Sequence, residues 1–173
     1  MNMNVPEKTS DTGDKPVSRR KARRKVLEIL FEYFQRPGCE IHDLLHRTFE
    51  EHLFGPQDAE EGLVIGDILG TNREFIENIA LIVAERCEQI DQILAAYPHE
   101  WKFERMGMPE KTILRIALCE LLFTDTPFKI VINEALDLAK IYGEVESNRF
   151  LNGILGSIIR DIDQLKEKHG IAS

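Results

Sequence analysis

The segment from Arg19 to Lys25 places six Lys and Arg side chains in seven consecutive positions. Guanidinium groups bind phosphate through two parallel N–H donors, and Lys adds a compact positive charge. Residues 1–25 hold eight Lys and Arg against three Asp and Glu, whereas residues 26–173 hold 14 against 27. The pattern indicates either a contact with a polyanion such as nucleic acid, or a solvated basic end that aids solubility or localisation.

This basic segment runs directly into a predicted amphipathic helix. Its apolar residues recur at three- and four-residue spacing, and they are Val26, Leu27, Leu30, Phe31, Tyr33 and Phe34. Cations in a first turn oppose the helix dipole, and a bound phosphate would reverse that penalty. Arg19 and Arg23 share the side of Val26 and Leu30 at 3.6 residues per turn, so we expect the first turn to project beyond the core.

Two histidines could serve metal chemistry, because His42 and His46 stand at positions i and i+4 of a predicted helix. The zinc-protease pattern requires Glu next to the first His, where this chain has Asp43, and no third ligand is fixed by the sequence. Solvated histidines are the favoured interpretation, and we predict no metal site.

Trp101 and Phe103 could form an aromatic platform for unstacked bases, with Lys102 and Lys111 close by. Aromatic residues in a connector more often close the end of a helical core, which is the favoured alternative. The glycines form neither a dinucleotide-binding nor a phosphate-loop pattern, and no Ser or Cys lies in a recognisable nucleophile motif. We therefore predict a protein that is not an enzyme and needs no cofactor.

Nearly every stretch after residue 17 has helical periodicity, and none alternates like a strand, so the predicted fold class is all-α. Residues 1–17 have the composition of a disordered leader. Helices are predicted over 41–53, 76–97, 109–123, 126–142 with Thr126 as the cap, and 147–165. Three widely spaced cysteines and the lack of a long apolar run predict a cytoplasmic protein without disulfides or a membrane span.

Four stretches are distinctive when taken together, and they are SRRKARRKVLEILFEYFQ, MPEKTILRIALCELLF, DTPFKIVINEALDLAKIYG and EVESNRFLNGILGSI. In this order and spacing they resemble the bacterial transcription antitermination factors of the NusB family. The resemblance implies a compact bundle of about seven helices in two subdomains over residues 18–170. It also implies binding to boxA-type single-stranded RNA together with ribosomal protein NusE, within the RNA polymerase complex that transcribes ribosomal RNA.

The resemblance also assigns roles to individual residues. Its arginine-rich motif matches Arg19, Arg20, Lys21 and Arg23, and its second RNA-facing segment matches Glu146, Arg149, Phe150 and Asn152. The NusE contact falls on Phe31 and Glu110. Contact with about four phosphates of a single strand predicts a log–log salt slope near −3.

The leader is extra relative to the family pattern, and residues 36–72 match the pattern poorly, so we expect a variable region over 36–72. We also expect a stand-alone adaptor and not a domain of a larger enzyme. The alternative is a protein-only interaction module or homodimer, in which the basic end of one chain covers the acidic surface of another.

Overall fold

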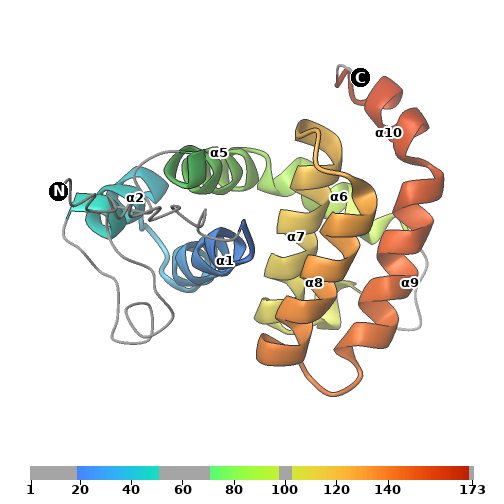
Figure 1. Ribbon diagram of the computed structural model, residues 1–173, viewed down its shortest axis with the longest axis horizontal. Coiled ribbons are helices and arrows are strands. Elements are labelled where there is room, and N and C mark those ends of the chain that lie inside the picture. The colour runs from blue at the N-terminus through green and yellow to red at the C-terminus, as the bar shows by residue number, and fades with distance from the viewer. Residues whose placement is uncertain (1–18, 51–70, 98–102, 172–173) are drawn as a thin grey trace, which may run out of the picture.

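The computed structural model describes residues 19–50, 71–97 and 103–171, which form eight α-helices, one 3₁₀ helix and no strand (Figure 1). The all-α prediction is therefore confirmed. The helices are α1 (Arg19–Gln35), α2 (Ile41–Glu50), α5 (Thr71–Glu85), α6 (Cys87–Ala95), η1 (Phe103–Arg105), α7 (Met108–Phe123), α8 (Phe128–Tyr142), α9 (Ser147–Arg160) and α10 (Ile162–Lys168). The predicted leader and most of the variable region lie outside the described residues.

The helices form two groups that meet along α7. Helices α1, α2 and α5 pack on one another, and α8 and α9 pack on the far side of α7 (Figure 1). Every residue from Thr112 to Leu122 of α7 is buried. This helix is therefore enclosed at the centre of the bundle, and Pro109 occupies its first turn as predicted.

The apolar stripes read from the sequence form the core. On α1, Val26, Leu27 and Leu30 are buried, while Phe31 and Phe34 are half-buried. The stripe of α9 is also buried, through Leu151, Ile154, Leu155 and Ile158. Burial of one face of α1 against α5 and α7 fixes the direction in which its basic first turn leaves the core.

Two helices predicted as continuous are each divided in two. The helix predicted over 76–97 breaks at Arg86, whose φ of −109° and ψ of 18° turn α6 away from α5. The helix predicted over 147–165 breaks at Asp161, whose φ is −106° and ψ is 7°. Neither position is Gly or Pro. The bends instead coincide with tertiary contacts, because Arg86 lies over the Phe123 ring and Asp161 accepts a hydrogen bond from Tyr97.

The predicted cap of α8 is also shifted. Pro127 occupies the N-cap position and no side chain caps the helix, so Thr126 is not its cap. The Thr124 hydroxyl donates to the Glu120 carbonyl at 2.8 Å, and its oxygen lies 2.9 Å from the Thr126 hydroxyl and accepts from the Thr126 N–H at 3.2 Å. Thr124 and Thr126 therefore close the α7–α8 turn.

Cys39, Cys87 and Cys119 are free thiols. Among the described residues, no helix is both long and apolar enough to cross a bilayer.

Candidate nucleic-acid interface

The first turn of α1 presents three cations, Arg19, Arg20 and Lys21, which we call the basic turn. Arg19 and Arg20 are exposed and Lys21 is half-buried. No acidic residue lies in this turn, so its charge adds to the positive end of the helix dipole. The Arg19 guanidinium lies 4.5 Å from the centroid of the Phe75 ring on α5, a cation–π contact that orients the side chain.

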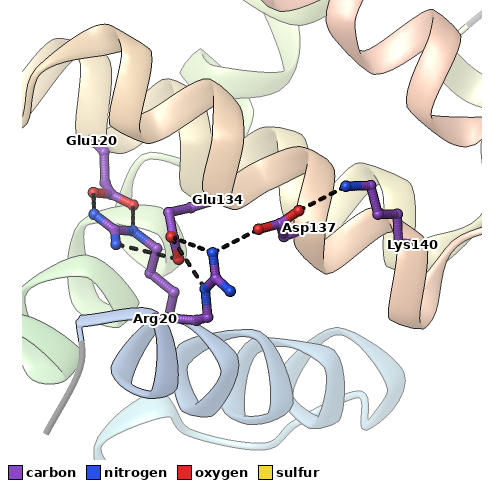
Figure 2. Close-up of polar contacts among 6 residues, drawn as sticks. Arg20, Glu120, Glu134, Asp137 and Lys140 are labelled. Atoms are coloured by element: carbon purple, nitrogen blue, oxygen red, sulfur yellow. Dashed lines mark hydrogen bonds and ion pairs between the residues drawn. The ribbon is translucent and has the colours of Figure 1, made fainter.

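Arg20 reaches across to two carboxylates of α8, Glu134 and Asp137, which we call the acidic pair (Figure 2). Its Nε and Nη2 donate to Glu134 Oε1 at 3.3 and 3.2 Å, and Nη2 also donates to Asp137 Oδ2 at 2.6 Å. The hydrogen bond to Glu134 and the charges of both carboxylates raise the pKa of the Arg20 guanidinium. Arg20 is therefore a permanently charged group that is already engaged within the protein.

The acidic pair is also held by cations other than Arg20. Lys140 donates to Asp137 Oδ1 at 2.8 Å, and this bond, with the charges of Lys140 and Arg20, lowers the pKa of the Asp137 carboxyl. Glu134 Oε2 lies 3.7 Å from Nη1 of Arg23. Cations of α1 and α8 therefore alternate with the acidic pair in one series of ion pairs, which joins the two helices (Figure 2).

Arg23 does not project beyond the core, which corrects the expectation for this residue. Its side chain is 4% exposed, and its Nε and Nη2 each donate to a Glu120 oxygen at 2.7 Å. Glu120 lies on α7 and is 1% exposed. The side of α1 that carries Val26 and Leu30 meets α7 at Arg23, so this guanidinium connects two helices inside the protein.

A surface pocket of about 160 Å³ separates the basic turn from the C-terminal half of α8. Its lining residues are Arg20, Lys21, Arg24, Glu134, Asp137, Leu138 and Ile141. Ile141 is 69% exposed, which is unusual for a large apolar side chain. The pocket thus combines three cations, the acidic pair and an apolar wall.

The second predicted RNA-facing segment, Glu146 to Asn152, lies where the α8–α9 connection enters α9. Glu146, Arg149 and Asn152 are exposed, whereas Phe150 is half-buried and packs against the core. Glu146 and Phe150 line a small pocket of about 40 Å³ together with Glu110. Helices α8 and α9 pack on each other. The short connection between them links this segment to the end of α8 that lines the first pocket through Leu138 and Ile141.

Glu110 is buried rather than displayed on the surface. Its Oε1 accepts hydrogen bonds from the Ser147 hydroxyl at 2.6 Å and from the Glu144 backbone N–H at 2.9 Å. The carboxylate therefore attaches the α8–α9 connection to the start of α7. Phe31, the other residue predicted to contact NusE, is half-buried on α1.

The sequence did not indicate Glu120, Glu134, Asp137 or Phe75 as partners of the basic residues. Arg23 and Glu120 are separated by 97 positions, and Arg20 and Asp137 by 117. The only local signal was the spacing of three between Glu134, Asp137 and Lys140, which places them on one side of a helix.

The other candidate sites gain no support as binding sites. His42 and His46 are exposed, and the described residues contain no group of three metal-ligating side chains. Phe103 is 8% exposed, with the Lys111 ammonium 5.5 Å from its ring, so it is a core residue and not a platform for bases. Trp101 lies outside the described residues.

Comparisons with known proteins identify the family of the chain. Residues 20–160 match the model of the NusB family. "Transcription antitermination protein NusB" of Desulforamulus reducens is 32% identical over 149 residues, covering 86% of this chain and 94% of that protein. The protein of the same name from Dictyoglomus turgidum is 35% identical over 150 residues, covering 86% and 89%.

Solved structures share the fold. T. maritima NusB superimposes with a TM-score of 0.67 at 27% identity, over 83% of this chain and 92% of that one. A chain in the crystal structure of antitermination factors NusB and NusE in complex with dsRNA gives a TM-score of 0.62 at 24% identity, over 82% and 96%. Both of these relatives bear the name of transcription antitermination proteins. From its sequence match and its fold, the chain belongs to the NusB family.

Proposed function

We propose that this protein is a transcription antitermination adaptor. It binds boxA-type single-stranded RNA together with ribosomal protein NusE, and the resulting complex acts on cytoplasmic RNA polymerase during ribosomal RNA transcription. The observation that carries the proposal is the basic turn, whose Arg19 and Arg20 are exposed on an acidic protein of net charge −8. Family membership supports the same role, since a related structure contains NusB, NusE and RNA.

In this proposal, Arg19, Arg20 and Lys21 bind phosphates. Contact with three phosphates of a single strand predicts a log–log salt slope near −2, shallower than the slope near −3 expected if Arg23 also took part. Arg23 acts as a positioning residue, because its pair with Glu120 would have to open before it could touch RNA. The acidic charges elsewhere repel the strand and confine its path.

The second RNA contact uses Glu146, Arg149, Phe150 and Asn152. Arg149 supplies a cation, while Glu146 and Asn152 offer groups that hydrogen-bond to base edges. Phe150 contributes its accessible edge to a base and keeps its remaining surface in the core.

The proposed NusE surface includes Phe31 on α1, and the carboxylates of Glu28 and Glu32 on the same helix suit a basic ribosomal protein. Glu110, the other residue of the proposed contact, acts through the α8–α9 connection, which it holds by accepting from the Ser147 hydroxyl and the Glu144 N–H. RNA and NusE strengthen one another by the same factor if their sites are coupled.

The test is a titration of labelled boxA-type RNA, and of a scrambled RNA of equal length, with and without NusE at two salt concentrations. We expect preference for the boxA sequence that increases when NusE is present. The variant Arg19→Ala, Arg20→Ala, Lys21→Ala should lose most of the affinity and flatten the salt slope, while its circular dichroism spectrum stays unchanged.

A matched control removes three exposed cations elsewhere, through Lys129→Ala, Arg160→Ala and Lys168→Ala. If this control loses as much affinity as the basic-turn variant, RNA responds to net charge and the proposed site is wrong. Equal affinity for both RNAs, with no effect of NusE, would instead favour the protein-only module or homodimer. Sedimentation across dilution and salt then identifies self-association.

A further inference from the structure

We propose that the acidic pair competes with RNA phosphate for Arg20, so that Glu134 and Asp137 limit the affinity of this protein for RNA. On RNA binding, Arg20 exchanges two carboxylates for a phosphate, while Arg23 and Lys140 remain with the carboxylates. This inference rests on the proposed RNA-binding function. It adds two acidic residues that oppose the binding of RNA instead of contacting it.

The first argument is that one edge of Arg20 serves both ligands. The Nε and Nη2 donors engage Glu134 and Asp137, and this edge is one that a phosphate would use for two parallel hydrogen bonds. A phosphate cannot take this edge while both carboxylates hold it. Binding through it therefore requires that the Arg20 ion pairs open.

The second argument is that opening is inexpensive. The Arg20 side chain is 61% exposed, and ion pairs with so exposed a partner contribute little stability. Each carboxylate also keeps a second cation after Arg20 leaves. Lys140 stays 2.8 Å from Asp137, and Arg23 Nη1 lies 3.7 Å from Glu134. Neither acidic side chain is left without a compensating charge.

The third argument concerns charge inside the pocket. Lys21 and Arg24 line the same pocket as the acidic pair, so a phosphate drawn to them also approaches two negative charges. Like charges that line or enter one small pocket repel appreciably even near a protein surface. The carboxylates therefore weaken RNA binding by occupying Arg20 and by repelling the phosphate.

The experiment measures the affinity of labelled boxA-type RNA for wild-type protein, Asp137→Asn and Asp125→Asn at low and moderate salt. Asp137→Asn is preferred to a change at Glu134, because Glu134 also lies against buried Arg23. Asp125 is exposed in the connection before α8, so Asp125→Asn causes the same change in net charge away from Arg20. We expect Asp137→Asn to bind RNA about two- to fivefold more tightly than wild type at low salt. Asp125→Asn should gain clearly less, and both gains should shrink as salt rises.

A double-mutant cycle with Arg20→Ala separates competition from general repulsion. In the Arg20→Ala background no guanidinium remains to be released, so Asp137→Asn should keep only the part of its gain that comes from weaker repulsion, and this gain should be clearly smaller than in the presence of Arg20. An equal gain with and without Arg20 would overturn the proposal.

Weaker RNA binding by Asp137→Asn would overturn it as well, and would make Asp137 a positioning residue for Arg20. Both results leave the proposed function intact, because wild-type protein still prefers boxA-type over scrambled RNA. Failure of wild type to bind RNA overturns the function and this inference together.

Discussion

The guanidinium of Arg23 and the carboxylate of Glu120 form two parallel hydrogen bonds of 2.7 Å inside the protein, between helices α1 and α7. Both side chains are almost fully buried. A buried pair stabilises little compared with apolar residues, but removal of one partner leaves an uncompensated charge. This pair therefore makes the attachment of α1 sensitive to either residue.

We expect Arg23→Ala to lower the free energy of unfolding by about 3–5 kcal/mol, because Glu120 would stay buried without a partner. Urea denaturation is the suitable measurement, since an ionic denaturant would screen the charges. The double variant Arg23→Met, Glu120→Leu should recover most of the loss. A loss below about 1 kcal/mol for Arg23→Ala would show that Glu120 is solvated.

Loss of the Glu110 carboxylate should loosen the α8–α9 connection. Glu110→Ala removes the acceptor of the Ser147 hydroxyl and of the Glu144 N–H, and we expect a loss of about 2–4 kcal/mol in unfolding free energy. Glu110→Gln keeps one carbonyl oxygen and should lose less. Thermal and urea denaturation of both variants test the ranking, which would be contradicted if Gln and Ala were equally damaging.

Two glycines should respond to alanine with opposite signs. A Cβ at Gly143 would lie 2.7 Å from the Ala139 carbonyl oxygen and 2.8 Å from Ser147 Oγ, the hydroxyl that donates to Glu110. We expect Gly143→Ala to destabilise the protein by about 1–3 kcal/mol. Gly153 on α9 has no atom within 4 Å of its Cβ position, so Gly153→Ala should stabilise by up to about 1 kcal/mol. Urea denaturation of both variants measures the two changes in unfolding free energy. If both changes had the same sign, a Cβ at Gly143 would not be crowded as proposed.

Tyr97 should make stability fall at alkaline pH. Burial, followed by the hydrogen bond to Asp161 and the negative charge of that carboxylate, raises the pKa of Tyr97 to about 12. A free tyrosine titrates near pH 10, so the unfolded chain loses this proton first as pH rises. The stabilisation by Tyr97 is complete below about pH 10 and is lost between about pH 10 and 12.

The matched variant is Tyr97→Phe, which has no proton to lose. Urea denaturation at about pH 9 and pH 11.5 should show a larger loss of stability for wild type than for Tyr97→Phe. Parallel losses in the two proteins would mean that Tyr97 titrates normally.

Much of the fold could be predicted from the sequence, because each helix buries one periodic face. Val26 and Leu30 of α1 and the apolar stripe of α9 lie where helical spacing placed them. The breaks at Arg86 and Asp161 could not be predicted, since neither residue is a local helix breaker and each bend coincides with a tertiary contact.

The candidate site was predictable in charge but not in geometry. The cluster of cations marks the basic turn in any reading of the sequence, yet nothing local indicates that Arg23 is buried while Arg20 is exposed. That difference arises from Glu120 and Glu134, which lie about a hundred positions away. The resemblance placed Glu110 on a partner surface, and its burial could not be predicted because its hydrogen bonds come from residues 34 and 37 positions further on.

The uninterrupted burial of residues 112–122 gives α7 a distinct place in the dynamics of the protein. Amide protons on a helix enclosed by α1, α5, α6, α8, α9 and α10 exchange with deuterium only when the whole assembly opens. Their exchange rates therefore measure the global unfolding equilibrium, whereas protons in the basic turn report local fraying at the end of α1. Binding of RNA to the basic turn would slow exchange of the amide protons in that turn. It would slow exchange of the α7 amide protons only as far as it stabilises the entire fold.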